Sequence, residues 1–249
     1  MQPMLHVLYQ DDWLVAIDKP PGLLVHRTGL DAGETRFAMQ MLRDQLGRHV
    51  WPVHRLDKGT SGLLLFALDA DTARLMGGAF ESGAGLSKTY QAMVRGWPAN
   101  KGCIDHPLKQ LPDDTRDLLE RIQPAQTHFA TLERLALPIF DGTHPDLRVA
   151  RVALQPLTGR RHQLRRHMKH IAHPILGDAT HGKGPLNRAV AQLIGAQRLW
   201  LHAVSLSLAH PHTGQPLHLQ ARPGPEWDIW QAPCLPAAGQ PTRHPGHAS

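Results

Sequence analysis

Cysteine, tyrosine and long apolar runs are scarce in this 249-residue chain. Its two cysteines cannot form a disulfide framework, so we expect a reducing compartment, the cytoplasm. No stretch reaches the roughly 18 apolar residues of a membrane helix. The N-terminal residues lack a basic segment and include Asp11 and Asp12, which argues against a signal peptide. These absences exclude disulfide-rich secreted proteins and proteins that span a membrane with helices.

Acidic residues are absent from one segment, 147–177, although the whole chain has 21 Asp and Glu against 27 Lys and Arg. That segment holds seven cations: Arg148, Arg151, Arg160, Arg161, Arg165, Arg166 and Lys169. Guanidinium groups at this density suit a phosphate backbone. A solvated basic helix is the alternative, but a sequence pI near 9.7 favours a nucleic-acid partner.

Strand-like and helix-like patterns interleave irregularly along the chain. Strands are predicted at 13–18, 63–68, 88–97 and 148–154, and helices at 36–46 and from a cap at Asp71 to about residue 80. A long strand over 199–208 changes its alternation phase, which predicts a bulge, and 217–221 should pair with it as a hairpin. This order predicts an α+β fold with a mixed, mostly antiparallel central sheet flanked by helices.

The chain is expected to form one catalytic domain over 1–230. Within it, residues 98–126 are rich in proline and charge and are predicted to be a surface insertion. Residues 231–249 contain four prolines and little to bury, so a flexible tail is expected there.

Residues 54–62, His-Arg-Leu-Asp-Lys-Gly-Thr-Ser-Gly, form a polar loop that runs into a buried strand. Asp57 in such a loop is most often a turn former. Here Arg55 lies two residues away and an apolar run follows, so the carboxylate would be held at the edge of a core. A held, ionised carboxylate is what nucleophilic or general-base chemistry uses.

A helix is also expected after residue 160, because Leu164, Met168 and Ile171 fall at i, i+4 and i+7. Arg165 borders this stripe and can point inward. Arg161, Arg166 and Lys169 are then predicted to face solvent or a nucleic acid.

These motifs resemble the RluA-type pseudouridine synthases. The hallmark of that family, His-Arg-Leu-Asp-x-x-Thr-Ser-Gly, is matched without substitution at 54–62. Further family-like segments follow in order at 18–26, 88–90, 157–165, 173–178 and 198–203, so the resemblance covers about residues 5 to 222. It implies isomerisation of uridine in RNA, with no cofactor and no metal. No room is expected before Leu5 for the extra N-terminal S4-type domain of many relatives.

The resemblance also implies roles for individual residues. Asp57 would be the nucleophile, Tyr90 would stack on the target base, and Arg165 would pair with Asp57 and keep it ionised. Leu164 would line the pocket and Arg55 would hold RNA around a flipped-out uridine. The remaining cations expected to contact RNA are Arg160, Arg161, Arg166 and Lys169.

Short peptides at 25–31 and 163–170 resemble the tRNA pseudouridine synthase C group, which modifies uridine 65 of tRNA. The alternative within the family is a short RluA-like synthase that acts on rRNA or another tRNA position. Two other classes are considered. A cluster of His162, His167, His170 and His173 could bind zinc, although no cysteine lies nearby. A non-catalytic RNA-binding protein would need a decayed site, yet Asp57, Tyr90 and Arg165 are all present.

Overall fold

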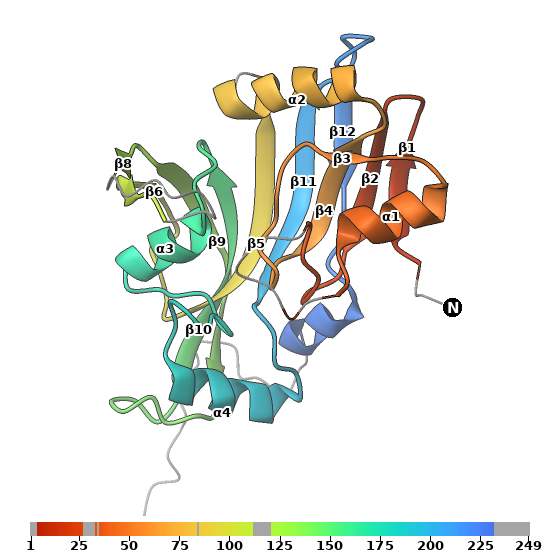
Figure 1. Ribbon diagram of the computed structural model, residues 1–249. Helices are drawn as coiled ribbons and strands as arrows, with labels where there is room; N and C mark the ends of the chain where they lie inside the picture. The colour runs from red at the N-terminus through yellow and green to blue at the C-terminus, as the bar shows by residue number, and fades with distance from the viewer. Residues whose placement is uncertain (1–3, 27–32, 34, 84, 112–120, 232–249) are drawn as a thin grey trace, which may run out of the picture.

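A ten-stranded mixed sheet forms the centre of the computed structural model, which describes residues 4–26, 33, 35–83, 85–111 and 121–231 (Figure 1). Strands follow the order β1-β2-β4-β11-β5-β10-β9-β6, and β12 and β3 pair with β11 and β4. Among the described strands only the β4–β11 pair is parallel. The expected α+β fold with a mixed, mostly antiparallel sheet is therefore confirmed.

The strands of this sheet are β1 (His6–Gln10), β2 (Leu14–Lys19), β3 (Trp51–Pro52), β4 (Ser61–Ala67), β5 (Ser87–Arg95), β6 (Lys101–Asp105), β9 (Gln126–Leu137), β10 (Leu147–Pro156), β11 (Leu201–Ala209) and β12 (Pro216–Gln220). A separate hairpin joins β7 (Leu108–Lys109) to β8 (Ile122–Gln123). The helices are α1 (Ala38–Leu46), α2 (Ala70–Ser82), α3 (Gln163–His170), α4 (Gly184–Ile194) and the 3-10 helix η1 (Pro225–Gln231).

Four helices pack against the sheet and contribute to three hydrophobic clusters. Helices α1 and α2 bury Leu42 and Met76 against β2 and β4, while α3 buries Met168 against β10. Helix α4 contributes Val190 to a third cluster that includes Trp200. The α3 and α4 clusters contain alternate residues of β10, which point to opposite faces of a strand. Figure 1 accordingly shows α3 and α4 apart, on either side of β10.

Several predicted elements are found with shifted ends or changed roles. Helix α2 is capped by Asp69, whose carboxylate accepts the Thr72 N–H at 2.7 Å, so the prediction of Asp71 as the cap was wrong. The predicted bulge in the long strand is confirmed by a register shift between Ala203 and Ser205 of β11. Its hairpin with β12 is also confirmed.

The segment 98–126 is only in part a surface insertion. Strand β6 joins the main sheet as an edge strand beside β9, and only the β7–β8 hairpin stands apart. Ile104 is the one buried side chain of β6, so a strand pattern was hard to recognise. Residues 112–120 lie outside the described part of the chain, as does the predicted tail beyond Gln231. No helix within the described ranges is long and apolar enough to cross a bilayer.

Candidate active site

The loop between β3 and β4 carries Asp57 and is tied down by the first motif of the chain. The Gly22 N–H donates to the Lys58 carbonyl at 2.8 Å. The fully buried Lys19 donates from Nζ to the carbonyls of Pro20, Leu23 and Lys58, at 2.9, 2.8 and 3.3 Å. Burial lowers the pKa of Lys19 to about 7, against the opposing charge of Asp57. The Asp-Lys-Pro-Pro-Gly segment thus holds the residue next to Asp57.

The motif ends in a glycine, Gly62, because the backbone at this position has no room for a side chain. Its φ is +103°, and a Cβ there would lie 2.3 Å from the Ala203 carbonyl oxygen. Only glycine fits where β4 pairs with β11. The loop that holds Asp57 therefore enters the sheet at a fixed point beside β11.

Arg165 on α3 reaches Asp57 across 108 residues of sequence. Its Nη1 donates to Asp57 Oδ2 at 3.0 Å, and the Arg165 side chain is only 9% exposed. The inward position expected from the apolar stripe of α3 is found, since Leu164 and Met168 are buried beside Arg165. The guanidinium compensates the carboxylate charge inside a largely enclosed site.

Asp178 holds the other edge of the same guanidinium. Arg165 Nε and Nη2 donate to Asp178 Oδ2 and Oδ1, each at 2.8 Å. Asp178 Oδ1 also accepts the Thr180 and His181 N–H groups, both at 2.9 Å. Burial alone would raise the pKa of Asp178, but Arg165 and these N–H groups hold it below its usual value. Burial alone would likewise lower the pKa of Arg165, whereas Asp178 and Asp57 raise it.

His162 lies beside this chain of charges, at the N-terminal cap of α3. Its φ is +53°, a conformation that non-glycine residues rarely adopt. Its Nε2 is 3.9 Å from Asp57 Oδ1. Burial lowers the pKa of His162 although Asp57 opposes the shift, so the ring is neutral near pH 7. Arg165 is therefore the charged partner of Asp57.

Tyr90 on β5 faces the same space. It packs against both core clusters that flank the site, one around β4 and one around α3. Burial, followed by the charge of Asp57, raises the pKa of the Tyr90 phenol. The phenol is protonated near pH 7 and presents a neutral aromatic surface.

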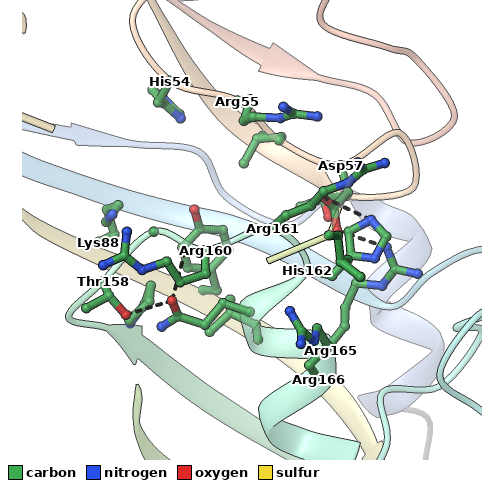
Figure 2. A pocket seen from close by; sticks show the side chains of 18 of the residues that line it. His54, Arg55, Asp57, Lys88, Thr158, Arg160, Arg161, His162, Arg165 and Arg166 are labelled. Atoms are coloured by element: carbon green, nitrogen blue, oxygen red, sulfur yellow. Dashed lines mark hydrogen bonds and ion pairs between the residues drawn. The ribbon is translucent and has the colours of Figure 1, made fainter. Parts of the chain in front are cut away.

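These side chains open into a cleft of about 470 Å³ between the Asp57 loop, β5 and α3 (Figure 2). Eight of the nine site residues expected from the sequence line it: Arg55, Asp57, Tyr90, Arg160, Arg161, Leu164, Arg165 and Arg166. Lys169 does not line the cleft and is exposed on α3. Seven Lys and Arg side chains line the cleft against two carboxylates, Asp57 and Glu81. The excess of positive charge in the cleft therefore suits a polyanion.

Comparison with known proteins shows the family of this chain. The family described as RNA pseudouridylate synthase matches residues 13–170, which include Asp57, Tyr90 and Arg165. The chain belongs to this family. This synthase is accordingly an isomerase, and its motifs place it among the RluA-type members.

Three relatives of the synthase are named tRNA pseudouridine synthase C. The Yersinia pestis protein is 48% identical over 92% of this chain and 89% of its own length. The proteins from Haemophilus ducreyi and Vibrio cholerae are each 47% identical, over 90% and 92% of this chain and 93% of their own lengths. Two human structures share the fold. RNA Pseudouridylate Synthase Domain Containing 4 has a TM-score of 0.68 at 25% identity and covers 93% of this chain and 94% of its own. Domain Containing 1 has a TM-score of 0.69 at 24% identity and covers 90% of this chain and 86% of its own.

Two of the four histidines considered as zinc ligands, His167 and His173, lie within hydrogen-bond distance of other groups of the synthase. His167 is buried, with Nδ1 2.9 Å from Thr127 Oγ1 and Nε2 3.0 Å from the His106 carbonyl. His173 Nδ1 lies 2.8 Å from the Arg95 carbonyl. Both nitrogens of His167 and one of His173 thus lie within hydrogen-bond distance of groups of the protein itself.

Sequence reasoning missed three groups in the synthase site. Asp178 ends a motif noted at 173–178, but its contact with Arg165 crosses a loop and leaves no periodic signal. His162 was considered as a metal ligand, an RNA contact or a hydrogen-bonding group of the histidine cluster, but not as a neighbour of Asp57. Lys88, two residues before Tyr90 on the same strand, could have been found from the i, i+2 spacing that places both on one face.

Proposed function

We propose that this synthase isomerises one uridine of tRNA to pseudouridine, at position 65, with Asp57 as the nucleophile. The observation that carries the proposal is the Asp57 carboxylate bonded to Arg165 at 3.0 Å inside a cation-lined cleft. The relatives' name supports tRNA as the substrate. Position 65 rests on the short peptides that resemble the same group. A tRNA substrate also accords with a cytoplasmic location.

The reaction needs no co-reactant. The bond between uracil N1 and ribose C1′ breaks, the base turns, and a bond forms between C5 and C1′. The proton lost from C5 balances the one gained by N1. Asp57 would attack the ribose or the base to release the uracil, with Arg165 compensating the carboxylate before the attack.

Tyr90 and Leu164 would hold the uracil during its turn. Tyr90 offers an aromatic face, and its protonated phenol is a hydrogen-bond donor rather than a base at neutral pH. Leu164 lines the cleft from α3 and helps exclude water.

The target nucleotide must leave its stack before Asp57 can reach it, at a cost of a few kcal/mol. Arg55, on the Asp57 loop, would contact the RNA from which the nucleotide is flipped. Arg160, Arg161 and Arg166, on the opposite wall of the cleft, would bind phosphates and offset that cost.

Asp57→Ala tests this assignment on unmodified tRNA transcripts, with pseudouridine mapped by chemical modification and primer extension. Asp44→Ala is the matched control, because that side chain is 59% exposed on α1. We expect position-65 product from the wild type and the control, and none from Asp57→Ala, whose tRNA affinity stays within about tenfold. Product from Asp57→Ala would refute the nucleophile. Product at another position, or only in rRNA, would refute the site of modification.

A further inference from the structure

The end of the cleft away from Asp57 contains a cation to which the roles above give no task. Lys88 lines the cleft from β5, two residues before Tyr90, so both side chains lie on one face of the strand about 7 Å apart along it. Figure 2 shows Lys88 with Thr158 and Arg160 at one end of the cleft and Asp57 with His162 at the other.

Three neighbours shape the surroundings of the Lys88 ammonium. Its Nζ lies 5.8 Å from the centre of the Phe80 ring. A Cβ at Gly159 would lie 3.9 Å from Nζ, so the absence of a side chain there leaves space beside the ammonium. His54 stacks on Phe80 at 4.8 Å, and burial followed by the nearby Lys88 charge lowers the pKa of His54 to about 3. The neutral His54 ring therefore supplies no charge to this end of the cleft.

No carboxylate pairs with Lys88 within the described part of the chain. The carboxylates that line the same cleft are Glu81 and Asp57, and Asp57 pairs with Arg165 at 3.0 Å. Burial lowers the pKa of Lys88, which reflects a charge moved partly out of water without a compensating partner. An anion from outside the chain would supply that partner.

The loop beside Lys88 is held firmly enough to form one wall of a site. Thr158 Oγ1 and the Arg160 N–H both donate to Gln163 Oε1, at 2.7 and 2.9 Å. Arg160 Nε donates to the Pro124 carbonyl at 3.1 Å, which anchors the guanidinium at the cleft edge. Gln163 itself is buried and donates to the Gln126 carbonyl at 2.9 Å.

We infer that Lys88 and Arg160 form an anion subsite that binds one backbone phosphate next to the target uridine. The inference rests on the proposed function, because it takes a base stacked on Tyr90 as its reference point. A lysine ammonium is a point charge that suits a phosphate oxygen, and Arg160 adds a second donor from the opposite wall. The subsite fixes the register of the RNA strand, so that the uracil beside this phosphate meets Asp57.

Binding of RNAs with single neutral phosphates tests the subsite. Short tRNA-derived stem-loops would each carry one methylphosphonate, placed in turn at phosphates along the strand, including both that flank the target uridine. For the wild-type enzyme we expect one flanking replacement to weaken binding about tenfold. In Lys88→Met the same replacement should weaken binding clearly less than in the wild type, because only Arg160 still serves that phosphate.

Lys101→Met is the matched control, since Lys101 is exposed on the edge strand β6 and does not line the cleft. It should keep the full methylphosphonate effect, and Lys88→Arg should keep most of it. If the loss of RNA affinity caused by Lys88→Met and the loss caused by each methylphosphonate are independent, so that their fold-changes multiply at every position, the subsite is refuted. A wild-type scan in which neither flanking phosphate matters refutes it without any variant.

Pseudouridine formation on the all-phosphate RNA separates this inference from the proposed function. Absence of product from the wild type, with the Lys88–phosphate coupling present, would overturn the function and leave the subsite standing. Formation of pseudouridine without coupling between Lys88 and a flanking phosphate would refute the subsite and leave the proposed function standing.

Discussion

Asp178→Asn would remove one charge from the Asp57–Arg165–Asp178 chain without changing the size of the side chain. The amide oxygen can still accept Arg165 Nη2 and the two backbone N–H groups that now meet Oδ1. The amide nitrogen then faces Arg165 Nε, donor against donor, where a 2.8 Å hydrogen bond exists in the wild type. Arg165 keeps only Asp57 as a charged partner.

The size of the effect follows from burial. Removing one partner of a buried ion pair costs about 3 to 5 kcal/mol, and we expect the lower figure because Asp57 still pairs with Arg165. A loss of about 3 kcal/mol in the free energy of unfolding lowers the melting temperature by about 6 to 12 °C in a chain of this size. Freed from its anchor, the guanidinium shifts relative to Asp57, and misplacement of about 1 Å costs up to about 100-fold in kcat.

Steady-state kinetics on tRNA, together with urea unfolding, would measure both effects. We expect kcat to fall about 10- to 100-fold while KM for tRNA changes less than about threefold, because Asp178 does not line the cleft. Asp146→Asn, at an exposed position, should leave both quantities unchanged. An Asp178→Asn enzyme that is destabilised but keeps the wild-type kcat would show that Arg165 needs no second carboxylate to serve Asp57.

Three further predictions follow from the geometry. Arg165→Ala should nearly abolish turnover with only modest loss of tRNA binding; wild-type kcat would refute the ion-pair argument. Gly62→Ala should destabilise the fold by more than about 3 kcal/mol, while Gly77→Ala, in open space on α2, should stabilise it by up to about 1 kcal/mol in urea unfolding. The His54 pKa falls from 6.5 to about 3 on folding. Stability from His54 is therefore complete above pH 6.5 and is lost as pH falls towards 3, by about 2 to 3 kcal/mol at about pH 4.5. His54→Asn should lack that part of the acid sensitivity, and parallel pH curves would contradict this.

Short-range sequence patterns predicted the parts of the site that a single helix or strand positions. The i, i+4 stripe of Leu164 and Met168 indicated the inward face of α3 and with it the position of Arg165. The phase slip in β11 indicated a bulge, which the register shift confirms. Alternation and helical spacing act over a few residues, so they leave a readable trace.

Contacts between segments that are distant in sequence left no such trace. The partner of Arg165, Asp178, follows a turn at Gly177, where a Cβ would lie 1.7 Å from the Arg198 carbonyl oxygen. That turn takes its shape from a segment 21 residues later, which no local pattern reports. The cap of α2 was misplaced for a simpler reason: Asp69 and Asp71 are both plausible caps by residue type, and only the backbone conformation distinguishes them.

The strand order also governs when the enzyme can first become active during its synthesis. Asp57 lies on the loop before β4, and Tyr90 lies on β5. Strand β11 lies between β4 and β5 in the sheet, although it follows both of them in the chain by more than 100 residues. A growing chain that ends before Leu201 lacks β11, so it would contain Asp57, Tyr90 and Arg165 without the strand that joins the two halves of the site.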